Sequence, residues 1–266
     1  MTADGPDALN LDNLVVGYGG GDVLRGVSFG IPRAGITAVI GPNGAGKSTL
    51  LAAIVGLLRP RAGRVLLDGK EITGISPQQA ISAGIVIVPQ ARSLFPGMTV
   101  AENVDLGGYT VRDRRVFAER RAMIVEMFPL VARYAKQRAG RLSGGQQRVV
   151  EFARCLMLEP TVVLLDEPSI GLDPGAMRVV YDSILEMRAR GKTVVLVEQN
   201  AKAALEVADK AVLLEAGQVR LAGAARELRD HAEIGGVYLG SGARRKTDPR
   251  HEPHVSAPAE RIGREQ

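Results

Sequence analysis

The chain has 266 residues, of which 45% are hydrophobic and 24% charged, and its formal net charge at pH 7 is +5. This is the composition of an ordinary soluble globular protein, and so modest a positive charge is most simply solvated surface. The single cysteine, Cys155, excludes an internal disulfide and predicts a packed core thiol. Residues 1–10 lack a signal-peptide pattern, and the longest apolar run, 48–58, is too short to cross a bilayer.

The first predicted elements are short strands around a turn-rich stretch. Residues 14–16 and 27–29 flank the glycine-rich stretch 17–22, a pattern that predicts an antiparallel hairpin. The pattern then predicts a buried strand over 36–40, a helix over 50–58 and a short strand over 63–69.

Three continuous runs of β-branched and leucine residues follow, over 85–88, 161–165 and 193–197. Such runs mark parallel strands covered on both faces. Together with the strand over 36–40 they predict an α/β fold whose core is a sheet of mainly parallel strands, preceded by an antiparallel β subdomain.

Between Pro89 and Cys155 the hydrophobic period is helical, with candidate helices over 100–106, 112–127 and 144–157. We therefore predict an inserted helical subdomain over about 91–157. A helix over 201–208, a hairpin over 211–221 that turns at residues 216 and 217, and a short helix near Glu227 are predicted next. Residues 241–266 are rich in arginine and proline and poor in large apolar residues, which predicts a disordered basic tail.

A glycine-rich loop joins the strand over 36–40 to the helix behind it. It reads Gly41-Pro42-Asn43-Gly44-Ala45-Gly46-Lys47-Ser48-Thr49. A glycine-rich turn can be a simple chain reversal, but this spacing between a strand and a helix predicts a P-loop that cradles phosphates. Glycines let backbone N–H groups point inward at a helix N-terminus. Lys47 would meet the β- and γ-phosphates, Ser48 would supply a hydroxyl to Mg²⁺, and Thr49 would add a phosphate contact.

An apolar strand that ends in two acids, Asp166 and Glu167, comes later in the chain. Successive strand residues point in different directions, so one acid can hold Mg²⁺ while the other faces the γ-phosphate. We assign Asp166 to the metal and Glu167 to the attacking water as general base. An acidic pair after a strand is also common as a helix cap, and the P-loop favours the catalytic interpretation.

A second anion-binding pattern lies directly before a predicted helix, in the stretch Leu142-Ser143-Gly144-Gly145-Gln146. It offers a hydroxyl, unhindered backbone N–H groups and a helix N-terminus. Standing alone, it would be better explained as a serine-capped helix start.

With the P-loop, the LSGGQ signature and the acid-tipped strand in this order, the sequence resembles the ATP-binding-cassette ATPases over residues 9–240. The resemblance implies ATP and Mg²⁺ as cofactors, ATP hydrolysis, and head-to-tail dimers in which each nucleotide lies between one chain's P-loop and the other's signature. By the same resemblance Tyr18 stacks on adenine, Gln90 senses Mg²⁺ and water, and residues 169–173 meet the opposite P-loop.

The residue after the last core strand departs from many relatives, which have histidine there, because this chain has Gln199. Glutamine can donate a hydrogen bond to the γ-phosphate but cannot become a cation. We therefore predict slow or partner-dependent turnover at this chain's own P-loop.

The stretch around Gln199, together with residues 95–103, 213–219 and 237–240, is similar to the LivF-type ATPases of branched-chain amino-acid importers and of related amide or urea importers. Three positions, Gln90, the LSGGQ signature and Asp173, are closer to the generic cassette. The resemblance implies a LivG-like second ATPase or a homodimer, permease subunits, an external solute-binding protein, and a peripheral position on the cytoplasmic face of the membrane.

Two alternatives remain open for the function. An exporter ATPase is the nearer one, although exporters more often carry the histidine that Gln199 replaces. A soluble cassette mechanoenzyme acting on nucleic acid or ribosomes usually needs two fused cassettes or a coiled-coil insertion, and neither pattern occurs in this sequence, so no nucleic-acid partner is predicted. For the tail, contact with anionic lipid is the alternative to simple disorder.

Overall fold

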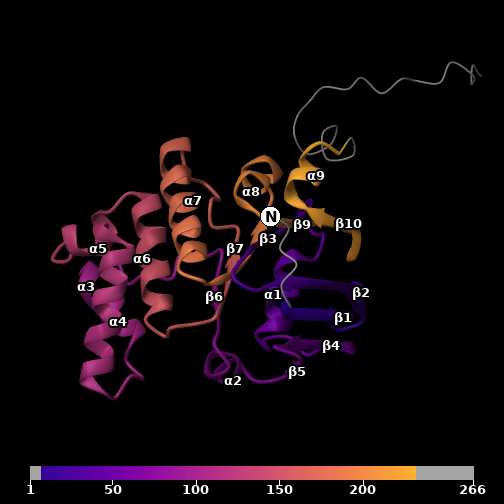
Figure 1. Cartoon of the computed structure of the whole chain (residues 1–266), viewed down its shortest axis with the longest axis horizontal. Helices are drawn as coiled ribbons and strands as arrows, with labels where there is room; N and C mark the ends of the chain where they lie inside the picture. The colour runs from indigo at the N-terminus through magenta and orange to yellow at the C-terminus, as the bar shows by residue number, and fades with distance from the viewer. Residues whose placement is uncertain (1–6, 232–266) are drawn as a thin grey trace, which may run out of the picture.

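The computed structural model describes residues 7–231. The predicted tail, 241–266, and the segment 237–240 lie outside these residues. Figure 1 shows an antiparallel sheet at one end of the molecule, a group of helices at the other end, and a larger sheet between them.

The larger sheet has six strands in the order β10-β9-β3-β8-β7-β6, all parallel except β10, which pairs antiparallel with β9. This confirms the predicted α/β core of mainly parallel strands. The strands are β3 (Ile36–Ile40), β6 (Ile85–Val88), β7 (Val162–Asp166), β8 (Thr193–Glu198), β9 (Lys210–Glu215) and β10 (Gln218–Ala224).

The smaller sheet is antiparallel, with the order β2-β1-β4-β5. It is made of β1 (Asp7–Tyr18), β2 (Gly21–Pro32), β4 (Ala62–Leu67) and β5 (Lys70–Glu71). The predicted hairpin is present, but its strands are much longer than 14–16 and 27–29. The register shifts between Leu11 and Leu14, where Asn13 has a φ of 49°. This irregularity breaks the alternation by which a strand is recognised.

The first helix, α1 (Lys47–Ile54), begins and ends earlier than the predicted range 50–58. Gly46, with a φ of 102°, is its N-cap. The helix does not continue through Gly56, because its φ of 74° is left-handed. Glycine is required there, since a Cβ would lie 1.7 Å from the Ile75 carbonyl oxygen. α2 (Pro77–Ser82) was not predicted, although the capping box formed by Ser76 and Gln79 marks its start.

Each of the remaining helices either covers the larger sheet or belongs to the end opposite to the antiparallel sheet (Figure 1). They are α3 (Val100–Gly107), α4 (Arg114–Met127), α5 (Pro129–Arg133), a 3₁₀ turn (Ala139–Arg141), α6 (Gly144–Leu156), α7 (Pro174–Ala189), α8 (Ala201–Val207) and α9 (Ala225–Arg229). In residues 7–231 no helix combines the length and the apolar character that a membrane span requires. The helices over 100–157 that we predicted are present, but the division of the chain into subdomains remains a prediction.

The central strands of the larger sheet, β3, β7 and β8, are buried on both faces. Along β3, Ile36, Ala38 and Ile40 pack into one core with α6, α7 and α8, whereas Val39 joins a second core with α1 and the antiparallel sheet. β7 and β8 divide in the same way. Two cores, one on each face, thus bury these strands, and their parallel pairing brings their carboxyl ends to one edge of the sheet.

Candidate nucleotide-binding site

The predicted site residues follow the carboxyl ends of neighbouring parallel strands. The P-loop follows β3, Glu167 follows β7, and Gln90 follows β6 after one intervening proline. β8 lies between β3 and β7, and β7 pairs with β6, so these strand ends share one edge of the sheet. Ligands of open α/β sheets bind at this edge.

The P-loop wraps around the side chain of Lys47, which is only 5% exposed. Its Nζ donates to the carbonyl oxygens of Gly41 at 2.9 Å and Pro42 at 3.1 Å. A Cβ at Gly41 would lie 2.1 Å from the Leu214 carbonyl oxygen, so glycine is required for this close approach to β9. The loop thus presents a buried ammonium at the N-terminus of α1.

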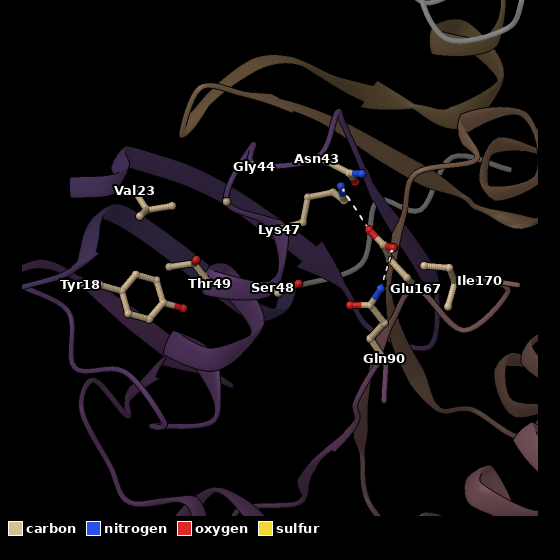
Figure 2. A pocket seen from close by; sticks show the side chains of 11 residues that line it. Tyr18, Val23, Asn43, Gly44, Lys47, Ser48, Thr49, Gln90, Glu167 and Ile170 are labelled. Carbon is tan, nitrogen blue, oxygen red and sulfur yellow. Dashed lines mark hydrogen bonds and ion pairs between the residues drawn. The ribbon is translucent and has the colours of Figure 1, made fainter. Parts of the chain in front are cut away.

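Glu167 lies between Lys47 and Gln90 in Figure 2. Its Oε1 is 3.4 Å from Lys47 Nζ, and its Oε2 accepts a hydrogen bond of 3.4 Å from Gln90 Nε2. The backbone at Glu167 has a φ of 44°, and its N–H donates to the Val197 carbonyl oxygen at 2.9 Å. A left-handed backbone at a non-glycine residue persists only where its surroundings hold it, as β8 does here.

Ser48 and Asp166 meet beside the loop, where Ser48 Oγ donates to Asp166 Oδ1 at 3.0 Å. Burial raises the pKa of the Asp166 carboxyl, and the hydrogen bond from Ser48 partly offsets this. A hydroxyl and a carboxylate oxygen in contact are suitable ligands for Mg²⁺, which also takes ligands from substrate phosphates. These two residues therefore fit the metal that the sequence predicts.

The pocket at this edge has a volume of about 470 Å³. It is lined by Tyr18, Val23, Asn43, Gly44, Gly46, Lys47, Ser48, Thr49, Gln90, Glu167 and Ile170. Tyr18 stands at one end of the pocket in Figure 2. The residue is 58% exposed, which leaves its flat ring free to stack on a base. Val23 and Ile170 were not predicted to line the pocket. Val23 belongs to the hairpin that carries Tyr18, and this was the only signal for it.

Gly41, Pro42, Ala45 and Asp166 adjoin the lining residues but are not among them. Two further predicted parts of the site, Gln199 and the signature, do not line this pocket either. Gln199 is exposed at the start of α8, where its carbonyl oxygen accepts from the Ala201 N–H at 2.9 Å. The signature is used as a capping box, because Ser143 Oγ accepts from the Gln146 N–H and the Gln146 side chain accepts from the Ser143 N–H. Ser143 is exposed, Gly144 and Gln146 are half-buried, and Gly145 is buried against α7.

Comparisons with known proteins agree with this geometry. The family model for "ABC transporter" matches residues 24–170. The probable branched-chain amino acid transport ATP-binding protein LivF of Archaeoglobus fulgidus is 39% identical over 228 residues, which cover 85% of this chain and 96% of that one. The high-affinity branched-chain amino acid transport ATP-binding protein BraG of Pseudomonas aeruginosa is 36% identical over 232 residues, 87% and 99% of the two chains.

The crystal structure of the ADP conformation of MJ1267, an ATP-binding cassette of an ABC transporter, superposes with a TM-score of 0.80 at 30% identity and covers 88% of this chain and 99% of that chain. Relatives named for Fe(3+) import and lipopolysaccharide export are 36% and 33% identical. The matched family model spans the P-loop, the signature and the acid-tipped strand. The chain therefore belongs to the ABC transporter family and is a nucleotide-binding, ATP-hydrolysing subunit of a transporter.

Proposed function

We propose that this chain energises an importer of branched-chain or closely related amino acids. The observation that carries the proposal is an apolar groove at the segment that follows Gln90, in a chain whose relatives include proteins named for this transport. The groove is where a permease subunit would receive the energy of ATP hydrolysis.

At the catalytic edge, Glu167 acts as general base and takes a proton from the water that attacks the γ-phosphorus. Phosphate oxygens replace the Gly41 and Pro42 carbonyls as acceptors for the Lys47 ammonium, which stays close to Glu167 and to the charge that develops on the phosphoryl group. Mg²⁺, held by Ser48 and Asp166 with Gln90 facing it, would neutralise phosphate charge.

The groove lies where the segment after β6 meets α3 and α6, and it has a volume of about 460 Å³. It is lined by Ser93, Phe95, Leu106, Gly107, Tyr109, Arg154, Cys155 and Leu158. Tyr109 is 80% exposed and Phe95 48% exposed, so large apolar side chains stand open to a partner. A cytoplasmic helix of a permease subunit fits such a groove through its apolar face.

The second ATPase would be a LivG-like chain or another copy of this one, placed head to tail so that the partner's signature faces this chain's P-loop. The exposed position of Ser143 and of the loop residue Ile170 supports this arrangement. The assembly would lie on the cytoplasmic face of the inner or plasma membrane, with an external solute-binding protein on the other side.

Uptake measurements test the cargo. A strain that lacks this chain should lose ATP-dependent uptake of labelled leucine, isoleucine or valine and regain it with the native chain but not with Glu167→Gln. Loss of urea or short amide uptake instead would favour the second candidate, an importer of those solutes. Unchanged uptake of all of them would contradict the import proposal.

Docking is tested separately with Tyr109→Arg, which places a charge in the groove without touching the nucleotide pocket. The native chain should follow permease-containing membranes on fractionation, and this variant should stay behind with its nucleotide affinity intact. The exposed Arg112→Glu, outside the groove lining, is the matched control.

A further inference from the structure

Gln90 does not belong to a strand, and its backbone is held by side chains of α6. β6 ends at Val88, and the chain then leaves the sheet. From α6, Arg148 donates one hydrogen bond to the Pro89 carbonyl oxygen and another to the Gln90 carbonyl oxygen, both at 2.9 Å. The guanidinium fork thus holds two consecutive peptide groups, which a lysine could not do in the same way.

Glu151 completes this contact one turn further along α6. Its Oε2 is 2.8 Å from Arg148 Nη1, and its Oε1 accepts from the N–H of Ser93. Arg154, on the next turn, donates to the Ser93 carbonyl oxygen at 2.8 Å. Successive turns of one helix therefore hold this segment at Pro89, Gln90 and Ser93.

Stability alone is a weak explanation for this pair. Arg148 is 5% exposed and Glu151 only 1%, so both charges are removed from water. Replacing a buried ion pair with apolar residues is often neutral or stabilising, because desolvation offsets the attraction. What the pair supplies beyond packing is a fixed position for the peptide groups that it contacts.

The position of the Gln90 backbone determines whether the side-chain amide of Gln90 reaches Glu167. The hydrogen bond from Gln90 Nε2 to Glu167 is 3.4 Å long, close to the outer limit of such an interaction. A displacement of the Gln90 backbone by a few tenths of an ångström would break it. α6 also begins at the signature, so Gln90 and Ser143 are attached to the same helix.

We propose that Arg148 and Glu151 are positioning residues that aim the Gln90 amide at the metal and the attacking water. The inference rests on the proposed role of Gln90, and it identifies the residues that fix the position of the Gln90 backbone. A positioning role predicts that removing Arg148 has an effect only while Gln90 is present.

The test compares Arg148→Met and Glu151→Gln in the native chain and in Gln90→Ala. The readout is the gain in ATP affinity of the full chain on going from EDTA to Mg²⁺, and the affinity in EDTA and the thermal midpoint are recorded as controls for folding. We expect Gln90→Ala and Arg148→Met each to reduce the Mg²⁺ gain about tenfold, the usual cost of losing a group that orients a metal site, and the double variant to lose no more. Glu151→Gln, which keeps the Ser93 contact, should act in the same direction but less.

Arg121→Met is the matched control, because Arg121 pairs with Asp105 and does not contact the segment after β6. If Arg148→Met reduces the Mg²⁺ gain equally with and without Gln90, or leaves it unchanged while Gln90→Ala lowers it, the positioning role is wrong. If Gln90→Ala itself has no effect, the proposed role of Gln90 fails instead. Should Arg148→Met not fold, Glu151→Gln decides by the same comparison.

Discussion

The P-loop and the signature both place backbone N–H groups at the start of a helix, but the structure completes only the first of them. Around the P-loop, Glu167 contacts both Lys47 and Gln90, and all three line a pocket. At the signature, the polar atoms of Ser143 and Gln146 satisfy each other, and Ser143 faces solvent. The P-loop end thus has its contacting side chains within the chain, whereas in the proposed dimer the signature end would meet its nucleotide only across the interface.

The largest effect on the ATPase rate should come from a substitution at the P-loop end, in Glu167. Glu167→Gln keeps the size of the side chain and removes the base, so turnover should fall about 10²- to 10⁴-fold, the range that general-base catalysis contributes. ATP affinity should be retained. Turnover and nucleotide binding of the purified chain check this, and an ATPase rate within twofold of the native rate would mean that another group is the base.

The next prediction tests the signature at the start of α6. Ser143→Asp keeps a good N-cap on α6 but puts a negative charge where the phosphate of a partner's nucleotide would arrive. ATP affinity of the isolated chain should not change, while turnover should be lost. Ser143→Asn, which caps equally well without the charge, is the control.

Mixing the two inactive variants sharpens the comparison further. A dimer of Glu167→Gln with Ser143→Asp has one site with both changes and one site with neither, so an equimolar mixture prepared before ATP is added should recover about a quarter of native activity. A mixture no more active than its parents would mean that two copies of this chain do not build the site, and that an unlike ATPase is required.

The P-loop end was predictable because its chemistry is local in sequence. The spacing from Gly41 to Thr49 and the two acids at the end of β7 indicate both the local fold and the residues that meet there. The contact of Arg148 with the Gln90 segment has no such pattern, because it joins residues 58 positions apart. Val23 was missed for the same reason, whereas Ile170 was predicted in the loop 169–173 but not as part of this chain's own pocket lining. The lengths of β1 and β2 were missed because a register shift hides their alternation.

Gln199→His should have a smaller effect. A hydrogen bond to the γ-phosphate from a charged donor is worth about 1 kcal/mol more than one from a neutral donor, which corresponds to roughly a fivefold higher turnover for the histidine variant. The exposed position of Gln199 at the start of α8 places it outside the pocket lining, so the gain should appear only when a dimer closes. ATPase rates measured against protein concentration test this, and a lower rate for the histidine variant would contradict it.

The smallest predicted effect concerns the stability of the fold, which is lowered by the buried carboxylate of Asp166. Burial raises the pKa of Asp166, so the folded chain binds its proton more tightly than the unfolded chain does. The stability linked to this proton is present below the ordinary pKa of an aspartate and is lost as the pH rises through the higher value of the folded state. At neutral pH the ionised carboxylate therefore destabilises the fold.

Asp166→Asn should remove this cost while it keeps an oxygen to accept from Ser48. The thermal midpoint of the variant should rise at pH 7, by roughly 2–4 °C if about 1 kcal/mol is regained, and the difference should shrink as the pH falls toward 4. Asp182→Asn, at an exposed position on α7, is the control and should change little. A midpoint for Asp166→Asn that is unchanged or lower at pH 7 would mean that Lys47 and the Ser48 hydrogen bond already compensate the buried charge. A higher thermal midpoint, together with loss of the Mg²⁺ dependence of ATP binding, would show that Asp166 lowers the stability of the fold and is needed to bind the metal.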